Sequence, residues 1–277
     1  LDTWEDVSGL QFQAVSNKND AQLQFDDEVL GRAYASTSIY TSGPQAGQAL
    51  TSTINIGKDW IGMHDGTAPG NYAFSTYLHE IGHALGLGHT GNYNGSANYS
   101  RDGLFEQDSY QTSVMSYFGP SENPNVDVSY GFAATLMQAD IIAIQNMYGL
   151  ETSTRTGDTT YGDNSTAGGY LDDMIGILNG DGLWYGALMT LYDDGGTDTL
   201  DLSSGTAAQR IDLTPGTASD ALGRIGNIVI DRSTIIENAV TGSGNDHVTG
   251  NDAANTIHTG AGNDTIAAGL GDDTIYA

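Results

Sequence analysis

Between Thr241 and Tyr276 the sequence repeats every nine residues, as TGSGNDHVT, GNDAANTIH, TGAGNDTIA and AGLGDDTIY. One aliphatic residue recurs at the eighth position of each copy: Val248, Ile257, Ile266 and Ile275. A short fixed period predicts a solenoid, in which every repeat packs only against its neighbours. The end of each copy predicts a short strand with its aliphatic side chain in the core. The pattern therefore predicts an all-β parallel β-roll, since a Gly/Asp-rich linker would not keep one aliphatic residue in register.

The glycine- and aspartate-rich part of each repeat predicts a turn that binds calcium. Glycine allows a six-residue turn that directs carbonyl oxygens inward, and aspartate adds the hard oxygen ligand that Ca²⁺ prefers. One turn gives half a coordination shell, so the turn two repeats later, on the same side, should complete it. Asp246 is then paired with Asp264, and Asn255 with Asp273. The predicted ligands are Gly242, Gly244, Asp246, Asn255, Gly260, Gly262, Asp264, Gly269, Gly271 and Asp273.

The second repeat departs from this pattern. Its segment 250–255, GNDAAN, has lost the glycines of the other copies. A site that depends on this segment, which includes Asn255, fits the calcium pattern less well than its neighbours. The repeat also continues to the last residues without a capping segment. Such an end predicts that the 277 residues are part of a longer protein.

The charge balance agrees with cation binding. Asp and Glu total 35 against 8 Lys and Arg, which gives a formal charge of −27. Without basic patches, nucleic acid and anionic membrane surfaces are poor partners. There is no cysteine, so disulfides and thiolate chemistry are excluded. No apolar run approaches the roughly 20 residues that span a bilayer.

The first 150 residues predict a different kind of domain. Period-two alternation predicts strands at 10–15, 21–25 and 50–56, and a helix is predicted at 71–87. Residues 91–130 are rich in Gly, Asn, Ser and Tyr and predict a long loop. Apolar residues at helical spacing from Ala133 to Met147 predict a second helix that stops at Gly149. We therefore expect an α+β domain at 1–150 and, because no helical period follows, an all-β domain at 151–277.

The strongest chemical signal is His79-Glu80-Ile81-Gly82-His83-Ala84-Leu85-Gly86-Leu87-Gly88-His89. On a helix, His79 and His83 are four residues apart and project from one face, so two imidazoles can reach one metal ion. Gly86 can adopt a positive φ, end the helix and turn the chain back so that His89 supplies a third nitrogen. Three neutral imidazoles that leave a position open for water and substrate predict one catalytic Zn²⁺.

Glu80 lies beside the first of these ligands and is predicted to be the general base. Zinc lowers the pKa of its bound water toward about 7, and Glu80 would accept the proton as this water attacks a peptide carbonyl. The competing interpretation is a helix whose histidines are merely buried in the core. A bare H-E-x-x-H would arise by chance in roughly one chain of this size in a hundred, and the added glycine and third histidine make chance far rarer.

These eleven residues resemble the extended zinc motif of the metzincins. The stretch Ser113-Val-Met-Ser-Tyr-Phe118 resembles their methionine turn, which implies that Met115 lies beneath the metal. A tyrosine two residues later is similar to serralysins and astacins, which implies that Tyr117 is a zinc ligand in the resting enzyme and then steadies the oxyanion. Serralysins usually have proline after the third histidine, where this chain has Thr90. The nonapeptide repeats and segment 153–159 favour the serralysins.

The resemblance implies a fold and further calcium sites. It implies a metzincin domain with a twisted, mostly parallel sheet, an active-site helix and a C-terminal helix, and an edge strand near 31–38 that pairs with extended substrate. It also implies several structural Ca²⁺ ions where the two domains meet. The residues that match these calcium segments are Arg155, Gly157, Thr159, Asp193, Gly195, Gly196, Asp198, Ile235 and Glu237.

The resemblance also implies a biological setting. The protein would be a secreted, extracellular bacterial endopeptidase, exported by type I secretion and monomeric. Its partners would be protein or peptide substrates, with a proteinaceous protease inhibitor as a further candidate. Two alternatives remain: a non-catalytic, calcium-dependent adhesin, which the intact Glu80 and three histidines argue against, and another repeat-bearing hydrolase such as a lipase. No G-x-S-x-G segment occurs, and this disfavours the lipase.

Overall fold

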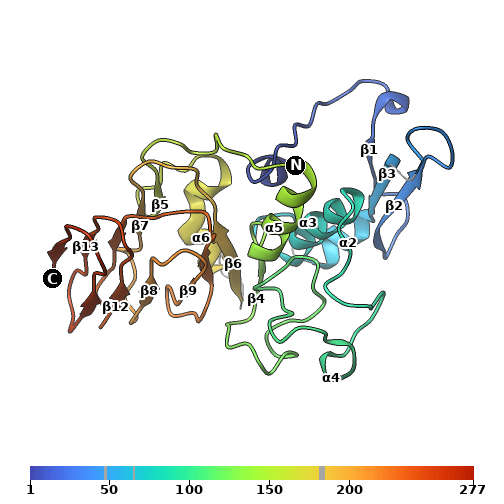
Figure 1. Cartoon of the computed structure of the whole chain (residues 1–277). Coiled ribbons are helices and arrows are strands. Elements are labelled where there is room, and N and C mark those ends of the chain that lie inside the picture. Colours follow the sequence, from blue (N-terminus) through green and yellow to red (C-terminus); the bar gives the residue numbers. More distant parts are fainter. Residues whose placement is uncertain (47–48, 65, 181–184) are drawn as a thin grey trace.

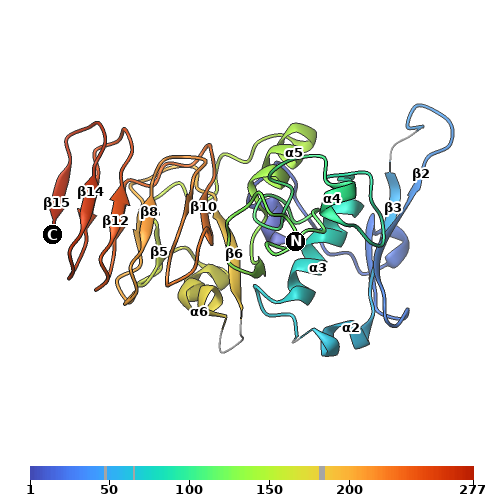
Figure 2. The same cartoon turned by 90° about the horizontal axis from the view of Figure 1, so that it is seen from below.

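The computed structural model describes residues 1–46, 49–64, 66–180 and 185–277. The molecule is elongated, with most of the helices in one half and a stack of short strands, together with helix α6 (Met174–Asn179), in the other (Figures 1 and 2). The N-terminal residue lies near the middle, and the C-terminus lies at the far end of the strand stack. In the described part of the chain, no helix has the length and apolarity required to cross a membrane.

The N-terminal half contains a three-stranded sheet in the order β1-β3-β2, formed by β1 (Leu23–Asp26), β2 (Ala33–Ile39) and β3 (Ala49–Ile56). β1 pairs with β3 in parallel, whereas β2 pairs with β3 antiparallel. The predicted strands near 21–25 and 50–56 are confirmed. This sheet is mixed, so the expectation of a mostly parallel sheet is wrong for the described residues. The cause is the connection from β2 to β3, which reverses the chain direction, as antiparallel pairing requires.

The predicted strand at 10–15 is wrong. This segment has no strand assignment, and most of its residues are exposed. Its alternation has another cause, because Leu10 and Phe12 pack against the N-terminal core while Gln11, between them, is exposed. The backbone N–H of Phe12 donates to the Glu5 side chain instead of to a neighbouring strand. Period-two burial thus arises here without any strand partner.

Four helices accompany this sheet after a one-turn helix α1 (Asp2–Glu5) and a 3₁₀ turn at Lys18–Asp20. They are α2 (Lys58–Met63), α3 (Tyr72–Ala84), α4 (Tyr99–Asp102) and α5 (Gln138–Tyr148). α3 confirms the helix predicted at 71–87. α5 confirms the second helix and its stop at Gly149 (φ +92°), although it begins five residues later than predicted. Ala133 belongs instead to strand β4, because its apolar neighbours fill the core in an extended conformation.

A second sheet joins the two halves. Its order is β4-β6-β10-β9, from β4 (Gly131–Ala133), β6 (Gly186–Leu191), β10 (Ile228–Ile230) and β9 (Ala218–Ser219). β4 pairs in parallel with β6, so backbone hydrogen bonds cross the predicted boundary near residue 150. That boundary remains a prediction, and the two halves share a continuous sheet there.

The second half is not all β. After a 3₁₀ turn at Gly169–Asp173, helix α6 (Met174–Asn179) packs beside β6. Met174, Ile177 and Leu178 are buried, and Gly180 ends the helix in the left-handed conformation (φ 76°). The buried residues follow the i, i+3, i+4 spacing of a helix, but a six-residue segment is too short for this spacing to be distinguished from chance in the sequence. Gly180 was a second local signal.

Beyond this helix the strands divide into two parallel sheets (Figure 2). One has the order β15-β13-β11-β7-β5, and the other has the order β14-β12-β8. The strands of the first are β5 (Thr160–Gly162), β7 (Thr199–Asp201), β11 (Asn238–Val240), β13 (Thr256–His258) and β15 (Thr274–Tyr276). Those of the second are β8 (Arg210–Asp212), β12 (His247–Thr249) and β14 (Thr265–Ala267).

The nine-residue repeat explains this division. β11 pairs with β13 as Asn238↔Thr256, and β12 pairs with β14 as His247↔Thr265, so each strand pairs with the one 18 residues further on. Successive repeats therefore alternate between the sheets. Val248 and Ile257 are fully buried as predicted, whereas Ile275, in β15, is 48 % exposed.

Candidate metal centre

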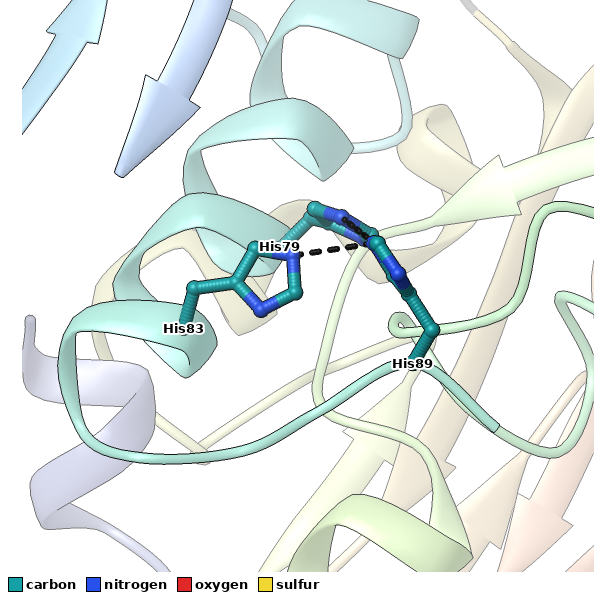
Figure 3. A group of neighbouring side chains, drawn as sticks. All are labelled: His79, His83 and His89. Carbon is teal, nitrogen blue, oxygen red and sulfur yellow. Dashed lines mark hydrogen bonds between the residues drawn. The ribbon is translucent and has the colours of Figure 1, made fainter. Parts of the chain in front are cut away.

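Helix α3 and the turn that follows it bring three histidines together (Figure 3). His79 and His83 project from one face of α3, as their spacing predicts. Leu85 caps the helix, and Gly86 has φ +105°, a conformation that favours glycine. The chain then turns back, so that His89 points toward the other two rings. The predicted roles of Gly86 in ending the helix and of His89 in closing the cluster are geometrically confirmed.

Each imidazole is held by a backbone carbonyl. The Nδ1–H of His79 donates to Val114 O (2.7 Å), that of His83 to Leu87 O (2.9 Å), and that of His89 to Tyr93 O (2.7 Å). A carbonyl can only accept, so every Nδ1 carries the proton. In the neutral rings, every Nε2 then has a free lone pair. Three distant backbone positions thus fix both the orientation and the tautomer of the rings.

The three Nε2 atoms converge at a spacing that suits Zn²⁺. His89 Nε2 lies 3.0 Å from that of His83 and 3.3 Å from that of His79. Zn–N bonds are about 2.0–2.1 Å, so tetrahedral ligands lie roughly 3.3 Å apart. Lone pairs this close repel unless a cation lies between them. The three residues therefore fit a zinc ion. In the described part of the chain, they form a cluster of metal-binding side chains whose ligand atoms all lie within 4.8 Å of one another.

Burial favours the neutral form of His79 and His89. Burial lowers the pKa of His79 to about 4, although its bond to Val114 acts in the opposite direction. Burial also lowers the pKa of His89, and the nearby His83 adds to the effect. Neutral imidazole is the form that binds metal, so two of the three rings are ready for a cation at neutral pH.

Glu80 lies beside the triad as a buried carboxyl group. It is 6 % exposed, and its Oε2 has no hydrogen-bond partner. Burial raises the pKa of Glu80 to about 7, while a hydrogen bond from the Ala35 backbone lowers it in part. Ala35 belongs to β2, so the carboxyl lies between α3 and the edge of the first sheet. A carboxyl with a pKa near neutrality can both accept and return a proton.

The predicted methionine turn packs directly against α3. Met115 is 2 % exposed, and a Cβ at Gly82 would lie 2.7 Å from its sulfur. Gly82 therefore allows a close approach that a larger residue would prevent. The same turn supplies Val114 O to His79, so it supports a ring as well as the helix.

Tyr117 lies beside the triad. Its ring centroid is 4.5 Å from that of His89 and 5.8 Å from that of His79, and its hydroxyl accepts a hydrogen bond from Gly95 N (3.4 Å). Tyr117 thus lies next to two of the histidine rings, whereas ligation of the metal by Tyr117 remains a prediction.

Two buried carboxylates support this site, and the sequence analysis missed both. Asp140, in the first turn of α5, accepts from Ser113 Oγ (2.6 Å), Val114 N (2.8 Å) and Met137 N (3.0 Å). It therefore binds the methionine turn to α5. An acidic residue three positions into a helix was the signal that could have indicated a capping role, but not its long-range partner.

The second missed carboxylate is Asp108. It is 2 % exposed and accepts from Ser116 Oγ (2.7 Å), from Thr90 Oγ1 and from the Tyr93 hydroxyl. It thus joins the loop that carries His89 to the turn that carries Tyr117. Thr90, which replaces the proline usual in serralysins, provides one of these bonds. No local sequence pattern connects these positions.

The predicted calcium residues near the join of the two halves lie in adjacent turns. Thr159 N donates to Asp198 Oδ1 (2.8 Å), and Asp198 N donates to Glu237 Oε2 (2.7 Å). Gly196 approaches Gly157 so closely that a Cβ would lie 2.5 Å from the Gly157 carbonyl oxygen.

The other four residues of this predicted group are Arg155, Asp193, Gly195 and Ile235. Gly195 N donates to Asp193 Oδ1 (2.9 Å), and Ile235 is 50 % exposed. The Arg155 side chain bonds to Asp6 and to the Tyr192 carbonyl, directly before Asp193. It therefore connects the start of the chain to the second half, and its predicted calcium role involves only the backbone.

Asp198 has the electrostatic signature of a cation site. It is fully buried, and its Oδ2 has no hydrogen-bond partner. Burial raises the pKa of Asp198 to about 7, and the nearby carboxylates of Asp193 and Glu237 act in the same direction. Buried carboxylates in such proximity repel unless protons or a cation neutralise them.

The turns of the nonapeptide repeats are stacked as predicted. Asp246 N donates to Asp264 Oδ1 (2.9 Å), and Asn255 N donates to Asp273 Oδ1 (2.9 Å). Both pairs are two repeats apart. The predicted glycines lie where backbones touch: a Cβ at Gly242, Gly244, Gly260, Gly262, Gly269 or Gly271 would lie within 2.4 Å of a carbonyl oxygen in the adjacent turn. Asp246 Oδ2 is buried without a partner, as Asp198 Oδ2 is.

Comparison with known families covers both halves. The family model described as Matrixin matches residues 1–97, and the one described as Met-zincin matches 72–159, which includes the three histidines and the methionine turn. The model described as Peptidase M10 serralysin C terminal matches residues 150–277.

Individual relatives agree with these matches. The chain is 37 % identical over 270 residues to the metallopeptidase AprA of Pseudomonas marginalis, covering 93 % of this chain and 54 % of that protein. It is 37 % identical over 274 residues to the serralysin of Proteus mirabilis, covering 93 % and 53 %. It is 38 % identical over 256 residues to serralysin C of Dickeya chrysanthemi, covering 89 % and 50 %. The chain thus spans about half the length of the curated relatives it matches, and it belongs to the serralysin family of metzincins.

Proposed function

We propose that the protein is a zinc-dependent endopeptidase that hydrolyses peptide bonds in proteins. The observation that carries this proposal is the convergence of three neutral Nε2 atoms, 3.0 and 3.3 Å apart, beside the buried carboxyl of Glu80. His79, His83 and His89 would hold the ion. A bound Zn²⁺ supplies a Lewis acid that acidifies water and polarises a carbonyl.

Glu80 performs the proton transfers in this proposal. With a pKa of about 7, it accepts a proton from the water that attacks the peptide carbonyl and then gives this proton to the leaving amine. The Tyr117 hydroxyl accepts a long bond from Gly95 N (3.4 Å), and in this proposal it turns toward the substrate oxygen and steadies its negative charge. We also propose that Tyr117 binds the metal in the resting enzyme.

Strand β2 is the proposed substrate-binding edge. It pairs with β3 along one side, and its Ala35 backbone contacts Glu80. An extended peptide added to the other side of β2 would run past the catalytic carboxyl, with main-chain hydrogen bonds that do not depend on side chains. Protein and peptide substrates fit such an edge, as would the inserted segment of a proteinaceous inhibitor.

The second half is proposed to be a β-roll that binds several structural calcium ions. The support lies in its two parallel sheets with an 18-residue register and in the buried, unpartnered oxygens of Asp198 and Asp246. Carboxylate and carbonyl oxygens are the donors that Ca²⁺ prefers, so these turns fit the ion chemically. We further propose that residues 1–150 and 151–277 form the two domains, and that the protein is a monomer secreted by type I export.

The test is casein hydrolysis in Ca²⁺ and trace Zn²⁺ by the wild type and by Glu80→Gln, which keeps the shape of the side chain but cannot accept the proton. Loss of the general base should lower kcat by about 10²–10⁴-fold while bound zinc stays at one per chain. Glu28→Gln, on the exposed surface, is the matched control and should retain full activity. Equal activity of Glu80→Gln and wild type would refute the role of Glu80.

A further inference from the structure

We propose that Asn251 and Asn255 together replace a bound cation in one turn of the second half. In this proposal the uncharged amides of the two side chains hold segment 250–255 together by hydrogen bonds without calcium. This turn then binds no ion of its own. The inference rests on the proposed calcium function of the neighbouring turns. It differs from the sequence-based prediction, which counted Asn255 among the ligands.

The neighbouring turns show the arrangement from which this one departs. In each, a carboxylate oxygen accepts a backbone N–H from the preceding layer: Asp198 from Thr159, Asp246 from Gln209, and Asp264 from Asp246, at 2.8–2.9 Å. At Asp198 and Asp246 the second oxygen is buried and unpartnered. These turns therefore hold a negative charge that a cation would neutralise.

Asn255 is oriented in the opposite sense. Its Nδ2 donates to the Glu237 carbonyl in the preceding layer (2.8 Å) and to Asn251 Oδ1 (2.9 Å). Its Oδ1 accepts from Asn251 N (2.9 Å), within its own turn. A carboxylate could not make the first two bonds, because it has no proton to donate at neutral pH. The Asn255 amide thus donates to the Glu237 carbonyl oxygen. In a calcium-binding turn, such an oxygen would instead be a ligand of the cation.

Asn251 completes the replacement. Its Nδ2 donates to Leu213 O (3.2 Å) and Ile236 O (2.9 Å), and its Oδ1 accepts from Ala253 N (3.0 Å) as well as from Asn255. Asn251 is 8 % exposed and Asn255 is 1 % exposed. All amide hydrogens and both oxygens of the pair are therefore bonded within the protein. This segment contains no counterpart of the unpartnered oxygens of Asp198 and Asp246.

The two asparagines occur together at the positions that matter. In the other three repeats, the second position is Gly242, Gly260 or Gly269, and the sixth is Asp246, Asp264 or Asp273. In this repeat the two positions are Asn251 and Asn255. The first change adds a side chain that fills the turn, and the second removes the charge. Either change alone would leave an unsatisfied group, whereas together they satisfy each other.

The test counts bound calcium and measures melting in the full chain. Native mass spectrometry and equilibrium dialysis should give the same number of Ca²⁺ ions for wild type and Asn255→Ala, and a smaller number for Asp246→Asn. In chelator, Asn255→Asp should lower Tm by roughly 5 °C, because it loses two donated bonds and buries a charge. Asn263→Asp makes the same chemical change at an exposed repeat position and should leave Tm in chelator within about 1 °C.

The two variants of Asn255 protect the test against misfolding, and both are compared by circular dichroism. A lower calcium count in Asn255→Ala or Asn255→Asp would make Asn255 a ligand and overturn the proposal. An unchanged Tm of Asn255→Asp in chelator would also overturn it. If the wild type binds no calcium, the calcium function fails, but melting in chelator still tests the asparagine pair.

Discussion

The two halves of the molecule differ in how their candidate cation sites are arranged. In the first half, every imidazole Nδ1 of the triad is bonded to a backbone carbonyl, and burial keeps His79 and His89 neutral. In the second half, Asp198 and Asp246 bury carboxylate oxygens that have no partner. The rings of the first site are thus held in orientation by the backbone, whereas the second contains charge that the fold alone does not balance. We expect the first ion to confer chemistry and the others to confer stability.

Among the predicted effects, calcium depletion should change the stability of the second half most. Removing an ion present at 1,000 times its Kd costs about 4 kcal/mol per site, and several sites would act together. Hydrogen exchange in a calcium-selective chelator should therefore deprotect strands β11–β15 before α3 and β3. Matching melting curves with and without Ca²⁺ would contradict the proposed dependence, and zinc content measured in the same samples shows whether the triad survives.

The raised pKa of Asp198 predicts how the stability of the metal-free protein depends on pH. Its pKa is about 7 in the folded state against 3.8 ordinarily, so between these values the folded protein binds more protons than the unfolded chain. This contribution to stability is fully present below about pH 4 and is lost as the pH rises through 7. In chelator, Tm should thus rise by a few degrees as the pH is lowered from 8 to 5.5. Asp198→Asn should flatten this dependence, and saturating Ca²⁺ should reverse it.

A smaller effect is expected where polar groups support the triad indirectly. Asp108→Asn and Thr90→Val each remove part of the network that joins the His89 loop to the turn of Tyr117. Loss of such support lowers metal affinity by about 10- to 100-fold. Competition with a zinc chelator measures this change, and Thr152→Val, on the exposed surface, serves as the control. Unchanged zinc affinity with unchanged kcat would show that the rings are fixed without Asp108.

The smallest predicted effect tests whether the first site depends on backbone shape. Gly86→Ala places a side chain at φ +105°, where an L-residue is strained by about 1–3 kcal/mol. We expect Tm to fall by about 2–8 °C and zinc affinity to fall, because the strain is relieved by moving His89. Gly88→Ala, which has open space around its Cβ, is the matched control. If Gly86→Ala leaves Tm unchanged, the turn has no role in closing the triad.

Local patterns in the sequence predicted the parts of the fold that depend on local geometry. Three patterns that extend over no more than nine residues are confirmed. They are the i, i+4 pair His79 and His83, the turn at Gly86 and the nine-residue period. Helix α6 was missed because its helical spacing extends over only six residues and does not stand out in the sequence. The mixed order of the first sheet depends on which strands meet, and alternation alone does not reveal this.

The supporting groups of the site were beyond local patterns. Asp140 reaches Val114 across 26 residues, and Asp108 reaches Thr90 across 18. The carbonyls that fix the imidazoles have no side-chain identity at all, so no residue type could indicate them. The amide of Asn255 shows the same limit in a repeat: the sequence indicated a weakened site, but only the hydrogen bonds show that its donors point toward the preceding layer.

The uniform spacing of the strand pairs has a consequence for how fast and in what order the second half can form. Each strand from β12 onward finds its template 18 or more residues back, and β13, β14 and β15 all do so at a separation of 18. The entropy of closing each loop is therefore nearly the same for successive layers. Growth should proceed like a zipper from the buried end at β7 and β8 toward β15. Since each layer with a calcium-binding turn would wait for its ion, the refolding rate should depend on calcium concentration in more than one step.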